Sequence, residues 1–136
     1  MVSHELLKSE KKELFKKISL FLSNRLLEIQ TEGKITDLEI MKITGWTNTR
    51  ISEMRHFDKY QIILPEKNLN ILITGGLITV ADLKSNLDLN GKETAYINSL
   101  RIYEIIKENP ELADAIIKAH EEGHNPTKII QDALKS

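Results

Sequence analysis

The fold of this chain is decided by residues 37–56, which read DLEIMKITGWTNTRISEMRH. The spacing of the apolar residues predicts two short helices, one ending near Thr44 and one starting after Thr47, with a turn at Gly45 between them. Glycine suits such a turn because it adopts a left-handed backbone without steric cost. Helices this short are not stable alone in water, so we expect the rest of the chain to support them by packing.

Both helices have a start signal in the sequence. Thr36 and Glu39 have the Thr-x-x-Glu spacing of a capping box, and Thr47 is placed to cap the second helix. Within the second helix, Ile51 and Met54 lie three residues apart and are predicted to face inward. Two short helices around a glycine turn predict a helix-turn-helix, in which the second helix enters the major groove of DNA.

The outward side of this second helix carries the candidate DNA-binding residues. Amide and hydroxyl side chains can contact base edges, and basic side chains can contact phosphates. We expect Arg50 and Arg55, on the flanks of the helix, and Lys59 beyond it to contact phosphates. The full candidate set is Thr47, Asn48, Thr49, Arg50, Ser52, Glu53, Arg55, His56 and Lys59.

The stretch TDLEIMKITGWTNTRISEMRHF resembles the helix-turn-helix of phage repressor, Cro and related xenobiotic-response-element regulators. The matching features are Gly45, the apolar Trp46, the capping Thr47 and the run Arg50-Ile51-Ser52. The resemblance extends over roughly residues 34–84, because two more short helices are predicted at 66–74 and 79–84. It implies a sequence-specific transcriptional regulator that binds double-stranded DNA as a homodimer. The residues that would read bases are Asn48, Thr49, Ser52 and Glu53.

Three residues depart from the pattern of these regulators. Met41 stands where alanine usually allows the helices to cross closely, and Thr44 stands where an apolar residue is usual. Asp37 stands where glutamine often contacts phosphate, and its charge would repel DNA. These departures leave a second interpretation open, in which the chain is a protein-interaction module (an antitoxin, adaptor or inhibitor) that retains the helix-turn-helix fold.

The remaining sequence predicts further helices and therefore an all-α protein. A long amphipathic helix is expected over residues 3–32, capped by Ser3, with a possible break between Ser19 and Ser23. It would join the helix-turn-helix in a domain of about five helices over residues 1–87. Turn residues around Asn90-Gly91 predict a boundary. The helical region 88–136, with helices at 94–109, 111–120 and from 126, would serve dimerisation or complete one core.

The composition limits the classes of protein. The net charge of −1 lacks the strong positive balance that many DNA-binding proteins carry. The absence of cysteine excludes disulfides and cysteine-based zinc sites. No apolar run approaches the roughly 18 residues that a membrane span needs. We therefore expect a cytoplasmic protein that requires neither cofactor nor membrane.

The segment HEEGH, residues 120–124, matches the H-E-x-x-H pattern in which two histidines on one helix face bind zinc. Gly123 and Pro126 would break the helix where His124 needs it. A third ligand is also required, and among the usual ligand types only Asp132 follows. The segment is therefore interpreted as an ordinary helix end without metal or catalysis, and a zinc-dependent hydrolase is the remote alternative.

Overall fold

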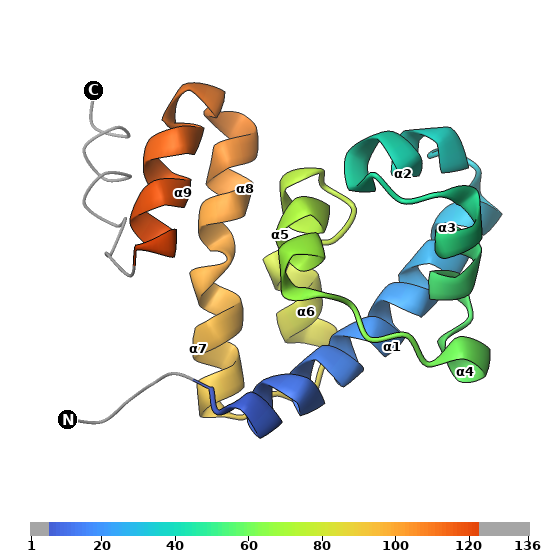
Figure 1. Ribbon diagram of the computed structural model, residues 1–136, viewed down its shortest axis with the longest axis horizontal. Helices are drawn as coiled ribbons and strands as arrows, with labels where there is room; N and C mark the ends of the chain where they lie inside the picture. The colour runs from blue at the N-terminus through green and yellow to red at the C-terminus, as the bar shows by residue number, and fades with distance from the viewer. Residues whose placement is uncertain (1–5, 123–136) are drawn as a thin grey trace.

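The computed structural model describes residues 6–122, which form helices joined by short connections, without strands in this range. The all-α prediction is confirmed for this part of the chain. Figure 1 shows α1 running diagonally, with α2 to α4 around its C-terminal end and α7 beside its N-terminal end. The elements are α1 (Lys8–Glu32), α2 (Asp37–Thr44), α3 (Asn48–Arg55), α4 (Phe57–Tyr60), α5 (Glu66–Thr74), α6 (Val80–Asn86), α7 (Gly91–Ser99), α8 (Arg101–Glu108), the 3₁₀ turn η1 (Pro110–Leu112) and α9 (Ala113–Glu121).

Helix α1 is the support on which the other helices pack. Near its start, the Leu7 N–H donates to Glu10 Oε1 at 2.9 Å, and Gly33 ends it in the left-handed region, with φ 71°. The helix continues through Ser19 and Ser23, so the break considered there does not occur. The predicted cap Ser3 lies outside the described residues.

One hydrophobic core extends from α1 to the last described helix. On α1 the apolar stripe is completely buried at Leu14, Ile18, Leu22 and Leu26. Full burial of such a side chain contributes about 2 kcal/mol. The same cluster of buried residues continues to Ile116 on α9. The described helices after residue 87, α7 to α9, therefore contribute side chains to the same core as α1.

The sequence prediction of one helix over 94–109 is wrong in two respects. The helix starts earlier, at Gly91, because Asn90 caps it: Asn90 Oδ1 accepts the Glu93 N–H at 2.8 Å. The helical run is also divided at Leu100 into α7 and α8. The start of α7 is bound to α1 by an ion pair, because the Lys17 ammonium donates to the buried Glu93 carboxylate at 3.2 Å.

The connector after α3 contributes only part of its large apolar residues to the core. Leu64 is buried and Ile62 is partly buried, but Tyr60 is 44% and Ile63 is 38% exposed. The short helix α4 was not predicted, and it ends at Tyr60. Beyond it the chain is non-helical, and in an extended chain successive side chains point to opposite sides. Ile63 therefore faces away from the core that Ile62 and Leu64 contact.

The predicted helices at 66–74 and after Thr79 are both present, as α5 and α6. Gly75 ends α5 as expected, and it also permits close packing against α2. A Cβ atom at Gly75 would lie 2.3 Å from Ile43 Cγ2, well inside contact distance. The α2–α5 contact therefore depends on the absence of a side chain at position 75.

None of the helices within residues 6–122 combines the length and apolar character needed to cross a membrane. The helix predicted from residue 126 onward lies outside the described part of the chain.

Candidate functional site

The first helix of the candidate site, α2, begins and ends as the sequence predicts. Thr36 Oγ1 accepts the Glu39 N–H, and Glu39 Oε2 accepts the Thr36 N–H, both at 3.2 Å. At the other end Gly45 adopts φ 76°, and its N–H donates to the Met41 carbonyl at 2.8 Å. The reciprocal cap and the left-handed glycine thus set the length of α2 and the direction in which the chain leaves it.

The turn between α2 and α3 is held by two threonines. The buried Thr44 donates its hydroxyl to the Ile40 carbonyl at 2.8 Å and accepts the Trp46 N–H at 3.1 Å. Its polar side chain is therefore satisfied at a position where an apolar residue was expected. Thr47 caps α3, because its Oγ1 accepts the Arg50 N–H at 3.1 Å.

Helix α3 divides into a buried side and an exposed side as predicted from Ile51 and Met54, which are both buried. Glu53 is half-buried, and its Oε1 lies 4.0 Å from Arg50 Nε. The candidate residues that α3 and its cap leave exposed are Thr47, Asn48, Thr49, Arg50 and Ser52.

Arg55 corrects the prediction of a phosphate-contacting flank residue, because it is only 5% exposed. Position 55 follows Ile51 by four residues, so the two side chains lie on the same face of α3. The guanidinium forms a two-point ion pair with Asp37 at the start of α2: Nη1 donates to Oδ2 at 3.2 Å, and Nη2 donates to Oδ1. Asp37, which we expected to repel DNA, instead joins the two helices.

Two further candidates lie outside α3. His56 is the exposed residue at which α3 ends, and its backbone has φ −121° and ψ 63°, so it does not continue the face of the helix. Lys59 belongs to α4, where its ammonium lies 5.2 Å from the centre of the Tyr60 ring. The structure therefore brings five exposed candidates together on α3 and its cap, and places His56 and Lys59 beyond its C-terminal end.

Two buried serines of α1 hold the C-terminal end of α3 and the segment that follows it. Ser23 Oγ donates to the Arg55 carbonyl at 2.6 Å and accepts the Phe57 N–H at 3.1 Å. One turn earlier, Ser19 Oγ accepts the Leu64 N–H at 2.8 Å. These bonds satisfy backbone groups where the chain leaves regular helix, which is where such groups need partners.

The sequence interpretation missed these serines and considered only a break in the helix at their positions. A signal was present, because Ser19 and Ser23 lie four residues apart next to the apolar stripe of Ile18 and Leu22. A hydroxyl that shares the buried side of a helix requires a hydrogen-bond partner. Their partners, however, lie 32 to 45 residues away in the sequence and could not be identified from it.

Two residues of the zinc alternative, His124 and Asp132, lie in the segment 123–136, outside the described residues. The side chains of His120 and Glu121 are likewise not described, and among the side chains that are, no three histidine, cysteine, aspartate or glutamate residues gather where they could hold a metal ion.

Comparisons with known proteins identify no relative of this chain: no protein-family model matches it, and no curated protein or solved structure does.

The Asp37–Arg55 ion pair predicts that the folded protein loses stability in acid. The hydrogen bond and charge of Arg55 hold the pKa of the Asp37 carboxyl below its usual value. Because the folded-state pKa is the lower one, the pair stabilises the protein above the unfolded-state pKa of about 3.9, and this contribution is lost as the pH falls through the folded-state pKa. Urea unfolding between about pH 6 and pH 2 should therefore show a smaller acid-induced loss for Asp37→Asn than for the wild type. Equal losses in the two proteins would contradict this assignment.

Proposed function

We propose that this protein is a sequence-specific DNA-binding regulator, of the kind found in phages and mobile elements, that places α3 in the major groove as the second helix of a helix-turn-helix. The observation that carries the proposal is the polar surface of α3. The helix leaves Asn48, Thr49 and Ser52 exposed while Ile51 and Met54 anchor its opposite side. Exposed amides and hydroxyls on a rigidly held helix suit the recognition of base edges.

The attachment of α3 supports the same proposal. A groove-reading helix must keep its orientation while it contacts DNA, because base recognition requires well-placed hydrogen bonds. Helix α3 is capped by Thr47, joined to α2 through Asp37 and tied to α1 through Ser23. Thr47 already accepts the Arg50 N–H, so the N–H groups of the exposed Asn48 and Thr49 are those that could donate to a phosphate.

The charges near α3 imply weak electrostatic attraction for DNA. With Arg55 buried, the candidate phosphate contacts are reduced to Arg50 and Lys59, which are both exposed. Two phosphate contacts per protomer correspond to a slope of about −2 in a plot of log K against log salt, and about −4 for a homodimer on two half-sites. Specificity would then depend largely on the base contacts of α3.

Binding to a DNA fragment from upstream of the protein's own gene, followed by fluorescence anisotropy at several salt concentrations, tests the proposal. Asn48→Ala should weaken binding to the preferred sequence by about tenfold and change the base preference. Arg50→Ala should weaken binding to all sequences alike and reduce the salt slope by about 0.9 for each protomer bound. Lys16→Ala is the control, because Lys16 is exposed on α1, remote in sequence from α3. No binding at low salt to this fragment or to a random-sequence library would overturn the proposal.

The second candidate function is a protein-interaction module, and one exposed apolar residue of α2 favours it. Leu38 is 59% exposed at the start of α2, beside the surface that would approach a DNA backbone. The net charge of −1 points the same way. If the function is protein binding, Leu38→Ser should abolish the interaction with the partner, whereas Asn48→Ala should leave it unchanged. If DNA binding is instead lost in Asn48→Ala and unchanged in Leu38→Ser, the DNA-binding regulator is supported.

A further inference from the structure

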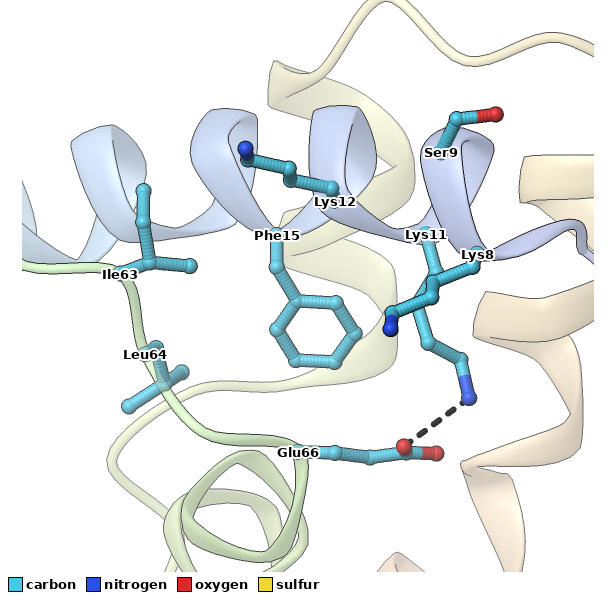
Figure 2. Close-up of a pocket in the computed structure, with 8 residues that line it drawn as sticks. All are labelled: Lys8, Ser9, Lys11, Lys12, Phe15, Ile63, Leu64 and Glu66. Carbon is cyan, nitrogen blue, oxygen red and sulfur yellow. Dashed lines mark hydrogen bonds and ion pairs between the residues drawn. The ribbon is translucent and has the colours of Figure 1, made fainter.

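A groove lies between the first turns of α1 and the segment that leads into α5 (Figure 2). It has a volume of about 730 Å³ and is widely open to solvent. Its apolar lining residues are Phe15, Ile63 and Leu64, of which Ile63 is exposed and the other two are buried. Figure 2 shows the Phe15 ring between α1 and this segment, with Ile63 and Leu64 on one side and Lys8 and Lys11 on the other, while Lys12 extends along α1 toward the side of Ile63.

The apolar surface of the groove is held in place by packing and hydrogen bonds. Phe15 is buried and meets the Tyr96 ring edge-on, with the ring centres 6.1 Å apart. The segment opposite is fixed because the Leu64 N–H donates to Ser19. Ile63, in contrast, is 38% exposed, so its side chain leaves apolar surface in contact with water. A bound apolar group would remove this surface from water, which is favourable.

The charges around the groove are unbalanced. Lys11 is neutralised by Glu66, whose Oε2 lies 2.9 Å from the lysine ammonium. Lys8 and Lys12 also line the groove and are exposed, and neither has an acidic partner among residues 6–122. Within the described residues the groove is therefore lined by three lysines and one carboxylate, that of Glu66, which pairs with Lys11.

From this combination we infer that the groove binds a small anionic amphiphile, a molecule with one carboxylate-type head and a short apolar chain. The ammonium groups of Lys8 and Lys12 would attract the head, and the chain would cover Ile63 and the exposed edge of Phe15. The volume fits such a molecule, and the positive charge selects an anion over a neutral or cationic head. This inference concerns a surface separate from α3 and does not depend on DNA binding.

Isothermal titration calorimetry with octanoate, below its micellar concentration, tests the inference. The full-length protein should bind one octanoate saturably, and octylammonium should bind at least tenfold more weakly because the lysines repel its positive charge. The double variant Lys8→Gln/Lys12→Gln should lose about fivefold to tenfold in affinity, since each solvent-exposed ion pair contributes up to about fivefold. Lys16→Gln is the matched control: this exposed lysine of α1 is not part of the groove, and its variant should bind as the wild type does.

A second variant tests the apolar part of the site. Ile63→Asp should abolish octanoate binding, because it removes apolar contact and adds a repelling charge; its circular dichroism spectrum should remain unchanged, since Ile63 is exposed. Absence of saturable octanoate binding would overturn the inference. Equally tight binding of 1-octanol, or undiminished octanoate binding by the double lysine variant, would overturn it too, because the anionic head would then have no role.

Discussion

Replacement of Ser19 and Ser23 together by alanine is expected to lower the free energy of unfolding by about 4 kcal/mol. The two hydroxyls serve the Leu64 N–H, the Phe57 N–H and the Arg55 carbonyl. Alanine fills nearly the same space but leaves these three backbone groups without a partner. Each buried group that loses its hydrogen bond lowers the free energy of unfolding by about 1–3 kcal/mol. Since domains are typically stable by only about 5–15 kcal/mol, the loss would be a large part of the total.

Urea denaturation followed by circular dichroism measures this loss. Ser9→Ala is the matched control, because Ser9 lies on the same helix but is exposed. The control should change the free energy of unfolding by less than about 0.5 kcal/mol. A loss below about 1 kcal/mol in the double variant would show that water or rearranged backbone replaces the serine hydroxyls, and the proposed anchoring of α3 to α1 would be wrong.

The second large effect is expected at the ion pair between α2 and α3. Asp37→Ala removes the hydrogen-bonding partner of the buried Arg55 guanidinium, whose Nε has no hydrogen bond within the described residues. Breaking a fully buried pair costs about 3–5 kcal/mol. The Asp37 side chain is 46% exposed, so water screens the charge and we expect a loss of about 2 kcal/mol.

A double-mutant cycle distinguishes the ion pair from other effects at Asp37. Arg55→Met keeps most of the buried volume and removes the charge, so Asp37→Ala/Arg55→Met should be more stable than Asp37→Ala alone. Asp58→Ala, at an exposed aspartate of α4, should have little effect. Additive losses from the two substitutions would mean that the pair contributes no coupling energy.

The single variant Arg55→Met also distinguishes a structural role of Arg55 from a direct contact between Arg55 and DNA. If Arg55 only stabilises α3 through its ion pair with Asp37, Arg55→Met should leave the salt dependence of DNA binding, the slope of log K against log salt, unchanged. A contact to phosphate would instead reduce the slope by about 0.9 for each protomer bound.

The helix ends of residues 36–56 could be predicted because the interactions that set them are local. The cap at Thr36 involves Glu39 three residues away, and the cap at Thr47 involves the backbone of Arg50. The left-handed turn at Gly45 likewise depends on a property of glycine itself. The burial of Ile51 and Met54 was predictable for a related reason, because residues three apart lie on the same face of a helix.

The role of Arg55 was mispredicted because a charged residue in a short helix is normally exposed. Its spacing from Ile51 placed it on the buried side, but only a partner from another helix makes such burial tolerable. That partner, Asp37, lies 18 residues earlier and had been interpreted as unfavourable for DNA binding. The division of the predicted helix 94–109 at Leu100 was also missed.

The amino-acid sequence by itself determined where the helices around Gly45 begin and end and which side of α3 carries amides and hydroxyls. Those properties follow from hydrogen bonds within one or two turns and from the helical repeat. Tertiary structure alone decided that Ser19 and Ser23 hold the end of α3, that Arg55 is withdrawn from the surface, and that Ile63 lines one groove with Phe15, Lys8 and Lys12. Each of these depends on contacts across 18 or more residues, and such contacts form only when packing of the core brings the segments together.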